Sequence, residues 1–262
     1  MKSWETELRL NGRFLTTDLG GAYLNLALEE AIFRANREVT VRVWDNERSV
    51  IIGRGQLARL ETDVEYCRLS RIPVVRRFSG GGAVYNGPGN VNWSFFVPRN
   101  FNSMNLRYMK GVSGIFTMVS RVVVSALEGL GVHSRLEPSN RIVNSGGKIS
   151  GMAAYLSREG LLCHGTLLLN ADLAEVSRLT TPVLGQPDRK YVRSNPTKVS
   201  NSGVSSSEFS EALREVLSKA TTLEFAYTGL TVEEMELLTQ LSPKYRNDDW
   251  NLGDPFSQRV FT

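Results

Sequence analysis

The glycine-rich segment at residues 76–94 constrains the fold more than any other part of the chain. It reads RRFSGGGAVYNGPGNVNWS. Ile72, Val74 and Val75 predict a short strand before it, and residues 91–97 predict a second strand after it. Three consecutive glycines would weaken any strand or helix that contained them, because each glycine loses much backbone entropy on folding. The segment therefore predicts a loop in which the backbone approaches another group closely.

The residues alone leave two interpretations of this loop open. In the first, the loop is a glycine-rich hairpin with two solvent-exposed arginines. In the second, backbone N–H groups and the side chains of Arg76 and Arg77 bind an anion, because guanidinium groups suit phosphate and carboxylate. The segment lacks the Gly-Lys-Ser/Thr of a Walker loop and the Gly-x-Gly-x-x-Gly of a dinucleotide fold.

Length and composition set only broad limits. The chain has 262 residues, enough for one large domain or two small ones, and a formal net charge of +4. Such a weak charge, without a nucleic-acid-binding motif, predicts no nucleic-acid partner. The chain shows no apolar export signal or membrane span, and Cys67 and Cys163 do not have the spacing of metal ligands. We therefore expect a cytoplasmic protein that does not bind a membrane.

Apolar spacing predicts strands and helices in irregular alternation. The predicted strands cover residues 8–15, 39–44, 49–52, 72–75, 91–97, 140–143, 160–169 and 223–226, and another follows Lys148. The predicted helices cover residues 25–34, 61–70, 105–130, 173–179, 206–219 and 232–241. Hairpins are expected at Asp45 and around the glycines, and residues 180–204 predict a mobile loop. The predicted fold class is α+β, with mixed β-sheets flanked by helices.

A second segment with a candidate functional residue is SGGKISGMAAY at residues 145–155. Glycines flank Lys148 there, just before a predicted strand. From the residues alone, Lys148 is either an exposed lysine in a β-turn or a rigidly placed ammonium. In the second case it could bridge a carboxylate and a phosphate.

These segments together resemble the lipoate–protein ligase family. The resemblance lies in RRxSGGGAVY with the later GNxNxS, in IGRxQ at residues 52–56, and in KISGxAxY followed by HGTLLLNADL. This family shares its catalytic fold with biotin–protein ligases and octanoyltransferases. The resemblance extends from about Leu10 to Gly253. It implies a single biotin/lipoate protein ligase-like catalytic domain over residues 1–262.

The resemblance also implies roles for individual residues. In the family, the lysine at the position of Lys148 binds the acyl-adenylate, which makes Lys148 the implied catalytic residue. His164 is interpreted as a wall of the pocket rather than a base. The implied ATP contacts are Arg77, Gly80, Gly81, Gly82, Ala83, Val84, Tyr85 and Lys148, and the implied lipoate contacts are Asn25, Glu29, Arg77, Lys148 and His164. The implied cofactors are ATP and Mg²⁺, with lipoate as substrate and metal ligands unknown.

The implied activity is ATP-dependent ligation of lipoate to a lysine of an acceptor protein, through lipoyl-AMP. Two alternatives are an octanoyl- or lipoyltransferase that does not use ATP, and a non-catalytic module that binds lipoate or a nucleotide. Some octanoyltransferases of this fold use a cysteine nucleophile upstream of the lysine segment. This chain has no cysteine there, and Cys163 is interpreted as a small buried side chain.

Two positions depart from the family pattern. After AVY the family usually has His-Asp, whereas this chain has Asn86 and Gly87. Where the family often has Arg-Asn-Asp, with an aspartate that helps to hold magnesium, this chain has Ser139, Asn140 and Arg141. Either Arg141 contacts a phosphate directly, or ATP and water hold the metal, or nucleotide use differs from the family norm.

The segment KYRNDDWNLG at residues 244–253 also resembles the family, in which a small domain follows. We expect that the C-terminal accessory domain is absent from this chain and is supplied by a separate small polypeptide. The expected contacts of that polypeptide are the apolar residues Trp250, Leu252, Phe256 and Phe261. The expected acceptors are lipoyl domains of a 2-oxoacid dehydrogenase acyltransferase subunit, glycine cleavage H protein or a similar protein.

Overall fold

The computed structural model describes residues 10–99, 111–138, 140–185, 189–221 and 223–257. Its strands are β1 (Leu10–Leu15), β2 (Thr40–Trp44), β3 (Ser49–Ile52), β4 (Val74–Arg76), β5 (Val84–Asn86), β6 (Asn90–Pro98), β7 (Arg135–Glu137), β8 (Arg141–Val143), β9 (Lys148–Leu156), β10 (Gly160–Leu168) and β11 (Leu223–Tyr227). They form an eight-stranded sheet in the order β11-β1-β2-β6-β10-β9-β8-β7 and a three-stranded sheet in the order β4-β3-β5. The predicted α+β class with mixed sheets is confirmed.

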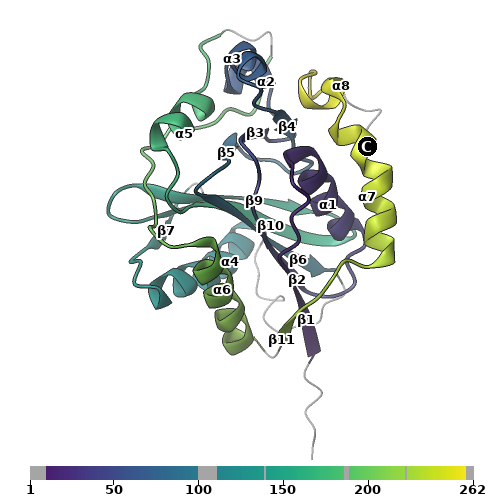
Figure 1. The fold of residues 1–262 in the computed structure, drawn as a ribbon, viewed down its shortest axis with the longest axis vertical. Coiled ribbons are helices and arrows are strands. Elements are labelled where there is room, and N and C mark those ends of the chain that lie inside the picture. Colours follow the sequence, from purple (N-terminus) through teal and green to yellow (C-terminus); the bar gives the residue numbers. More distant parts are fainter. Residues whose placement is uncertain (1–9, 100–110, 139, 186–188, 222, 258–262) are drawn as a thin grey trace, which may run out of the picture.

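The helices are α1 (Ala22–Arg34), α2 (Ala58–Glu61), α3 (Val64–Leu69), α4 (Gly111–Gly129), α5 (Leu173–Thr180), α6 (Ser206–Ala220), α7 (Val232–Tyr245) and α8 (Asp248–Asn251). Figure 1 shows α4 and α6 at one side of the large sheet and α1 and α7 at another. None of these described helices is long and apolar enough to cross a membrane.

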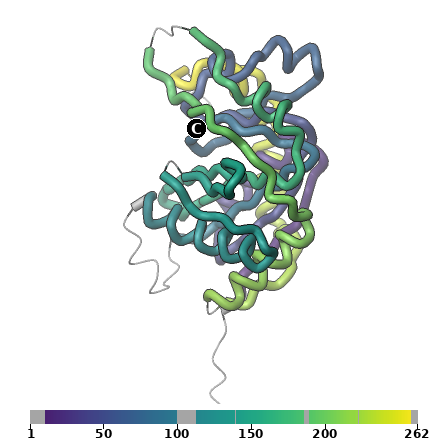
Figure 2. The backbone as a smooth tube through the Cα atoms, turned by 90° about the vertical axis from the view of Figure 1, so that its left-hand side faces the viewer, coloured from purple at the N-terminus to yellow at the C-terminus, as the bar shows by residue number. Residues whose placement is uncertain are grey.

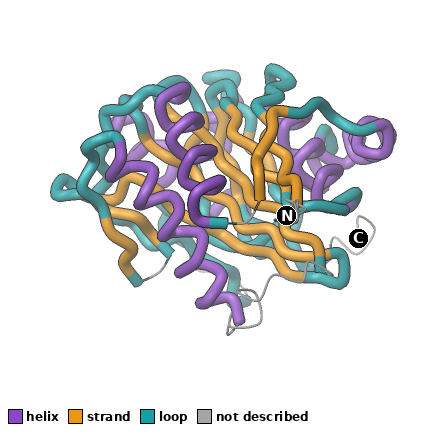
Figure 3. Tube along the Cα trace, turned by 90° about the horizontal axis from the view of Figure 1, so that it is seen from below, coloured by secondary structure: helices purple, strands orange, loops and turns teal. Residues whose placement is uncertain are grey.

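The main core lies between the large sheet and helices α4 and α6. Val123 of α4, Leu213 of α6 and Trp93 of β6 are all buried in it. Figure 3 shows two neighbouring helices lying across the strands. Helix α6 begins at a capping box, in which the Ser205 side chain and the Glu208 side chain each bond to the other residue's backbone N–H. Apolar spacing and this cap together explain why the prediction of α6 was accurate.

Helix α1 is buried on several faces because it lies between the two sheets. Leu28 and Ile32 pack with Phe96 of the large sheet. Ala27 packs in a different cluster, which includes Ile51 of the small sheet and residues of α7. Helix α1 therefore lines a cavity that lies between the sheets.

The two predicted hairpins are wrong. Strand β2 belongs to the large sheet and β3 to the small one, so the turn at Asp45 connects two sheets. The strands predicted on either side of the glycines are β4 and β6, and these also belong to different sheets. Strand β5, which the sequence did not indicate, follows the loop, and β3 lies between β4 and β5, parallel to β4 and antiparallel to β5. The glycine loop therefore crosses over the end of β3. Local turn signals identified the turns but could not show that a third strand intervenes.

The predicted helix at residues 61–70 is confirmed as α3, although α3 begins later than predicted, and α2 is a separate short helix before it. The backbone is extended at Thr62, and the Asp63 side chain caps α3 by accepting a hydrogen bond from the Tyr66 N–H. Parts of two other predictions, residues 8–9 and 105–110, lie outside the described residues. The remainder of each forms β1 and α4, respectively.

The expectation that Trp250 contacts a partner is wrong. Its side chain is 1% exposed, and its Nε1–H donates to the carbonyl oxygen of Arg76 at 2.8 Å. Leu252 packs against a core cluster of the small sheet. Phe256 is 53% exposed, and Phe261 lies outside the described residues. The tail is thus fixed largely by its own domain as far as it is described.

After α5, the described residues up to α6 contain no helix or strand, apart from an isolated bridge between Lys148 and Val199. Figure 2 shows this stretch in green, running from the small-sheet end of the molecule towards α6. Its backbone is attached at several points, since the Val192 N–H donates to Gly55 O and the Lys148 N–H donates to Lys198 O. The prediction that this segment is irregular is confirmed, whereas its mobility stays a prediction.

Candidate active site

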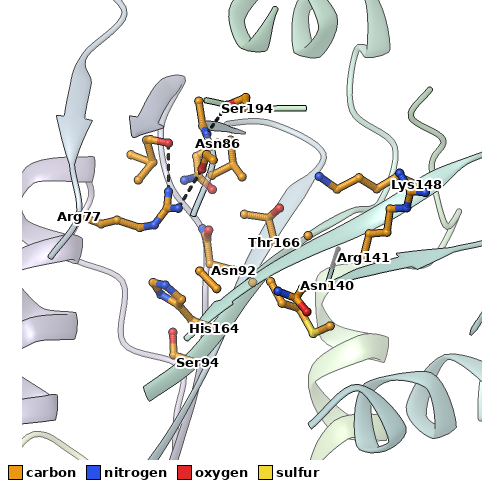
Figure 4. Close-up of a pocket in the computed structure, with 18 of the residues that line it drawn as sticks. Arg77, Asn86, Asn92, Ser94, Asn140, Arg141, Lys148, His164, Thr166 and Ser194 are labelled. Atoms are coloured by element: carbon orange, nitrogen blue, oxygen red, sulfur yellow. Dashed lines mark hydrogen bonds between the residues drawn. The ribbon is translucent and has the colours of Figure 1, made fainter. Parts of the chain in front are cut away.

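A cavity of about 240 Å³ lies between the two sheets. Helix α1 lines one side of it through Leu26 and Glu29, and residues 193–195 with Thr197 line another. Figure 4 shows the polar side chains that surround it. Its position between sheets explains why residues far apart in the sequence meet there.

The register of the large sheet forms the floor of the cavity. One row across five strands is Arg141, Gly151, Thr166, Asn92 and Trp44, each directly opposite the next. All five residues line the cavity. Because neighbouring strands lie ~4.8 Å apart, this row spans ~19 Å. The floor therefore suits an elongated ligand.

A second row lies two residues along the same strands. It consists of Ala153, His164 and Ser94, which are also opposite one another and also line the cavity. Since side chains alternate between the faces of a strand, residues two apart share a face. Trp93, which lies between the rows on β6, is buried in the main core instead.

The two ends of the cavity differ in chemistry. At the β2 end, Leu26, Trp44 and Ile51 provide an apolar wall that α1 and the small sheet complete. At the β8 and β9 end, Arg141 and Lys148 provide positive charge. This arrangement suits a ligand with an apolar part and an anionic part.

Lys148 reaches the cavity because of a β-bulge. Ile142 pairs with Ser150 but Val143 pairs with Lys148, which leaves Ile149 as an extra residue. As a result Lys148 and Gly151 both line the cavity although they are three residues apart. A Cβ at Gly151 would lie 2.8 Å from Lys148 Nζ, so the side chain crosses directly over this glycine.

Among the described residues, no hydrogen-bond acceptor or carboxylate partners the Lys148 ammonium. Burial lowers the pKa of Lys148, and the nearby charges of Arg141 and Arg77 lower it further. A partly buried cation without a counterion is a candidate for binding an anionic ligand.

Arg77 holds the glycine loop in shape. Its Nη2 donates to Gly82 O at 2.8 Å, and its Nε donates to Ser79 Oγ at 3.1 Å. Burial lowers the pKa of Arg77 to about 10. Gly81 has a φ of +90°, and a Cβ there would lie 2.8 Å from Arg77 Nη2. The loop thus curls around the guanidinium group, and Gly81 is required both for its backbone angle and for space.

The glycine loop contributes only part of the predicted set to the cavity. Gly82, Ala83 and Val84 line it, together with Arg77. Gly80 and Gly81 shape the turn and are not among the lining residues. Tyr85 is buried away from the cavity, with its hydroxyl donating to Glu175 Oε2 at 3.1 Å, and burial together with Glu175 raises its pKa to about 12.

The proposal that Arg76 binds an anion is wrong. Its side chain is fully buried and donates to backbone carbonyl oxygens, including Trp250 O at 2.7 Å and Gly253 O at 2.9 Å. The Arg76 N–H also donates to Asn251 Oδ1. Arg76 therefore joins the C-terminal segment to the small sheet, and of the paired arginines only Arg77 lines the cavity.

Glu29 and His164 form a buried, hydrogen-bonded pair in the cavity wall. Glu29 Oε1 lies 2.8 Å from His164 Nδ1 and accepts from Ser94 Oγ at 2.6 Å. Ser79 Oγ lies 2.7 Å from His164 Nε2. Burial by itself would raise the pKa of Glu29, but His164, Ser94 and Arg42 together lower it, so the carboxylate stays ionised. Both predicted residues line the cavity, with His164 in its wall.

Asn25, the remaining predicted lipoate contact, does not line the cavity. It is fully buried, and its Oδ1 accepts from Arg42 Nη2 at 2.6 Å and from the Leu19 N–H at 3.1 Å. Its Nδ2 donates to Asp18 Oδ1 at 2.7 Å. Asn25 thus fixes the start of α1 against β2, next to the apolar end of the cavity.

Ser194 is a site residue that the sequence did not indicate. Its Oγ accepts from the Ala83 N–H at 2.8 Å and from Gln56 Nε2 at 3.1 Å. The fully buried Glu61 holds it in place, because Oε2 accepts from the Ser194 N–H and Oε1 accepts from Arg193 Nε, both at 2.9 Å. No local pattern in residues 181–204 could have predicted this contact.

Comparison with known proteins identifies the family. A family model described as the lipoyl protein ligase A/B catalytic domain matches residues 21–218. The chain belongs to this family. The lipoate-protein ligase A subunit 1 of Thermoplasma acidophilum is 30% identical over 267 residues, which cover 93% of this chain and 97% of the relative. A lipoate-protein ligase A from Aeropyrum pernix is 35% identical over 181 residues, which cover 68% of this chain and 65% of the relative.

Solved structures of ligases have the same fold. A T. acidophilum lipoate protein ligase with bound lipoic acid has a TM-score of 0.79 at 28% identity and covers 93% of this chain and 100% of its own. The bipartite ligase of that organism, studied with its E2 lipoyl domain, has a TM-score of 0.79 at 28% identity, with 93% and 97% coverage. A lipoate-protein ligase A bound with ATP has a TM-score of 0.79 at 27% identity, with 93% and 99% coverage. The predicted ligase-like fold is confirmed.

Proposed function

We propose that this chain catalyses ATP-dependent lipoate–protein ligation. The observation that carries the proposal is the ~19 Å floor that runs from Trp44 to Arg141. Its apolar end suits the ring and alkyl chain of lipoate, and its cationic end suits the phosphates of ATP. The unpaired ammonium of Lys148 lies at the cationic end, where a carboxylate and a phosphate would meet. Relatives with bound lipoic acid and with bound ATP support this assignment.

In the first step, a carboxylate oxygen of lipoate attacks the α-phosphorus of ATP. A C–O–P linkage forms, the bond between the α-phosphorus and the bridging oxygen breaks, and pyrophosphate leaves. Lys148 would hold the two anions together against their repulsion and stabilise the charge that develops on the α-phosphate oxygens. Arg77 would support this step by keeping Gly82 and Ala83 in position along the cavity.

In the second step, an acceptor lysine, as the neutral amine, attacks the acyl carbon of lipoyl-AMP. The amide bond forms, the acyl–phosphate bond breaks, AMP leaves, and the proton that the amine nitrogen loses passes to the departing phosphate or to water. Lys148 would again stabilise the departing phosphate. Glu29 and His164 would keep the acyl end of the cavity ordered, because both are buried and bonded to each other.

Mg²⁺ stays a prediction. Within the described part of the chain, no group of three or more His, Cys, Asp or Glu side chains could hold a metal ion. Among the described residues, Glu29 is the one carboxylate that lines the cavity; His164 and Ser94 occupy its Oε1, and its buried Oε2 has no hydrogen-bond partner. We propose that an ion that accompanies ATP is held mainly by phosphate oxygens and water.

The acceptor and the accessory polypeptide also belong to the proposal. The bipartite T. acidophilum ligase, with its E2 lipoyl domain, supports a lipoyl domain as acceptor and a second subunit as helper. An acyltransferase subunit of a 2-oxoacid dehydrogenase and glycine cleavage H protein are the acceptors that we propose to test first. We also propose a cytoplasmic location, because a chain with only two cysteines fits a reducing compartment.

The experiment that tests the function is lipoate-dependent exchange of radioactive pyrophosphate into ATP. A ligase gives exchange that depends on lipoate, whereas an octanoyltransferase or a binding module gives none. The thioester route of a transferase also lacks a suitable nucleophile, since Cys67 and Cys163 are both buried and burial raises the pKa of each thiol. Exchange without lipoate, or acyl transfer from acyl carrier protein without ATP, would overturn the proposal.

A further inference from the structure

The charges around the cavity are unbalanced. Among the residues that the structure describes, four cationic side chains line it, from Arg77, Arg141, Lys148 and Arg193, against one carboxylate, Glu29. Glu29 is fully buried and already bonded to His164 and Ser94. The cavity therefore has excess positive charge, and the question is which of its cations an incoming anion can reach.

Two of the four cations are engaged within the protein. Arg77 donates to Gly80 O, Gly82 O and Ser79 Oγ, which occupies most of its guanidinium group. Arg193 forms an ion pair with Glu61 at 2.9 Å, and its Nη2 donates to Leu60 O and Val183 O. Arg77 and Arg193 thus mainly stabilise the loops that form the cavity wall.

Arg141 is less completely neutralised. Its Nη1 donates to Thr197 Oγ1 at 2.9 Å, and its Nε lies 3.3 Å from Glu137 Oε2. Glu137 is shared, because its other oxygen accepts from Arg135 Nη2 at 2.6 Å. No partner of Arg141 Nη2 occurs among the described residues. One carboxylate therefore serves two guanidinium groups, and part of the Arg141 fork is available.

The two available cations are close together. Arg141 lies opposite Gly151 in the sheet, and the Lys148 side chain crosses over Gly151. Figure 4 shows Arg141 and Lys148 next to each other at one end of the cavity. Two like charges in this position repel, which is consistent with the lowered pKa of Lys148. A ligand with more than one negative charge would relieve this repulsion.

Building on the proposed function, we propose that Arg141 binds phosphate oxygens of ATP directly, beside Lys148. A guanidinium fork can donate two parallel hydrogen bonds to one phosphate, which makes arginine well suited to this role. Among the alternatives that the sequence leaves open for Arg141, the structure thus favours direct contact with phosphate. The consequence is that ATP binds without a divalent ion held by a protein carboxylate.

The test is calorimetric titration of the full chain with ATP and with adenosine, each with excess Mg²⁺ and with EDTA. We expect the wild-type protein to bind ATP with similar affinity in both conditions. Arg141→Gln should weaken ATP binding about tenfold or more, because a charge-assisted contact is lost, and should leave adenosine binding unchanged. Arg141→Lys should fall between the two, since it keeps the charge but loses the fork.

Arg135→Gln is the matched control. It removes the other arginine that shares Glu137, but Arg135 does not line the cavity. The control should bind ATP as the wild type does, and thermal unfolding should show that all three variants are folded. Unchanged ATP affinity in Arg141→Gln would overturn the inference, as would an equal loss in Arg135→Gln, an equal loss of adenosine binding, or wild-type ATP binding that requires Mg²⁺.

Lipoate-dependent pyrophosphate exchange, measured on the same protein samples as ATP binding, distinguishes failure of this inference from failure of the proposed function. Lipoate-dependent exchange with unchanged ATP affinity in Arg141→Gln would overturn the inference alone. ATP binding that depends on Arg141, without lipoate-dependent exchange, would support the inference and overturn the proposed function. A wild-type chain that does not bind ATP would overturn both.

Discussion

Gly80 and Gly81 are neighbours with opposite structural requirements, so alanine substitutions should affect them differently. At Gly81, φ is +90°, and a Cβ would lie 2.8 Å from Arg77 Nη2 and 3.2 Å from Ala153 Cβ. At Gly80 a Cβ would meet nothing within 4 Å, and φ is not in the left-handed region. The pair thus separates a general effect of adding a methyl group from the specific role of Gly81.

The left-handed backbone costs an alanine about 1–2 kcal/mol. The close contact with a guanidinium group that several hydrogen bonds hold in place adds about 1–2 kcal/mol of overpacking. Gly81→Ala should therefore lower the free energy of unfolding by about 2–4 kcal/mol, or Tm by roughly 4–16 °C for a domain of this size. Gly80→Ala should be neutral or stabilising by up to about 1 kcal/mol, because it restricts the unfolded chain.

Thermal and urea unfolding measure both changes, and calorimetry with ATP and with lipoate measures the effect on the site. Gly81→Ala should weaken ATP binding more than lipoate binding, since Arg77 and Gly82 would shift at the loop. Equal stabilities for the two variants would show that Gly81 does not hold the strained position that the structure gives it. Equal losses for both ligands would refute a selective role of the loop in nucleotide binding.

Two further predictions concern buried carboxylates. Glu61→Gln should destabilise the protein by about 1–3 kcal/mol, because it removes the charged partner of Arg193 and loosens Ser194; unchanged urea unfolding would contradict this. Burial alone would raise the pKa of Glu30, but Lys244, Tyr245 and Arg34 lower it below the ordinary value of 4.5. Its contribution to stability is therefore complete above that pH and is lost as pH falls through the lowered pKa. Urea unfolding across acidic pH should show a shallower fall for Glu30→Gln than for the wild type, and parallel curves would contradict the assignment.

Local sequence signals predicted most elements because their causes are local. The capping box at Ser205 and the apolar spacing of α6 specify that helix within a few residues. The pairing of strands was less predictable. Strand β3 separates β4 from β5, and nothing in the glycine loop indicates this insertion. Turn chemistry shows where a chain reverses, but the partners of each strand depend on contacts distant in sequence.

The candidate site was likewise predictable where it depends on local motifs and unpredictable where it depends on long-range contacts. Lys148, Arg77, Glu29 and His164 lie around one cavity, and their sequence motifs had predicted them. The burial of Arg76 depends on Trp250, which is 174 residues away, so adjacency to Arg77 was a misleading guide. The roles of Ser194 and Glu61 likewise depend on a long-range contact between an irregular segment and a buried carboxylate. The bulge that directs Lys148 became visible only through the register of β8 and β9.

The central claim is that Lys148 joins the anionic ends of lipoate and ATP. The most direct measurement is single-turnover formation of lipoyl-AMP, detected by mass spectrometry, in the wild type and in Lys148→Ala. We expect the wild-type protein to form lipoyl-AMP and release pyrophosphate in equal amounts. We expect Lys148→Ala to form essentially none while it unfolds at nearly the same temperature, since the ammonium has no partner in the described residues to lose. Lipoyl-AMP formation by Lys148→Ala at a rate near that of the wild type would contradict the account.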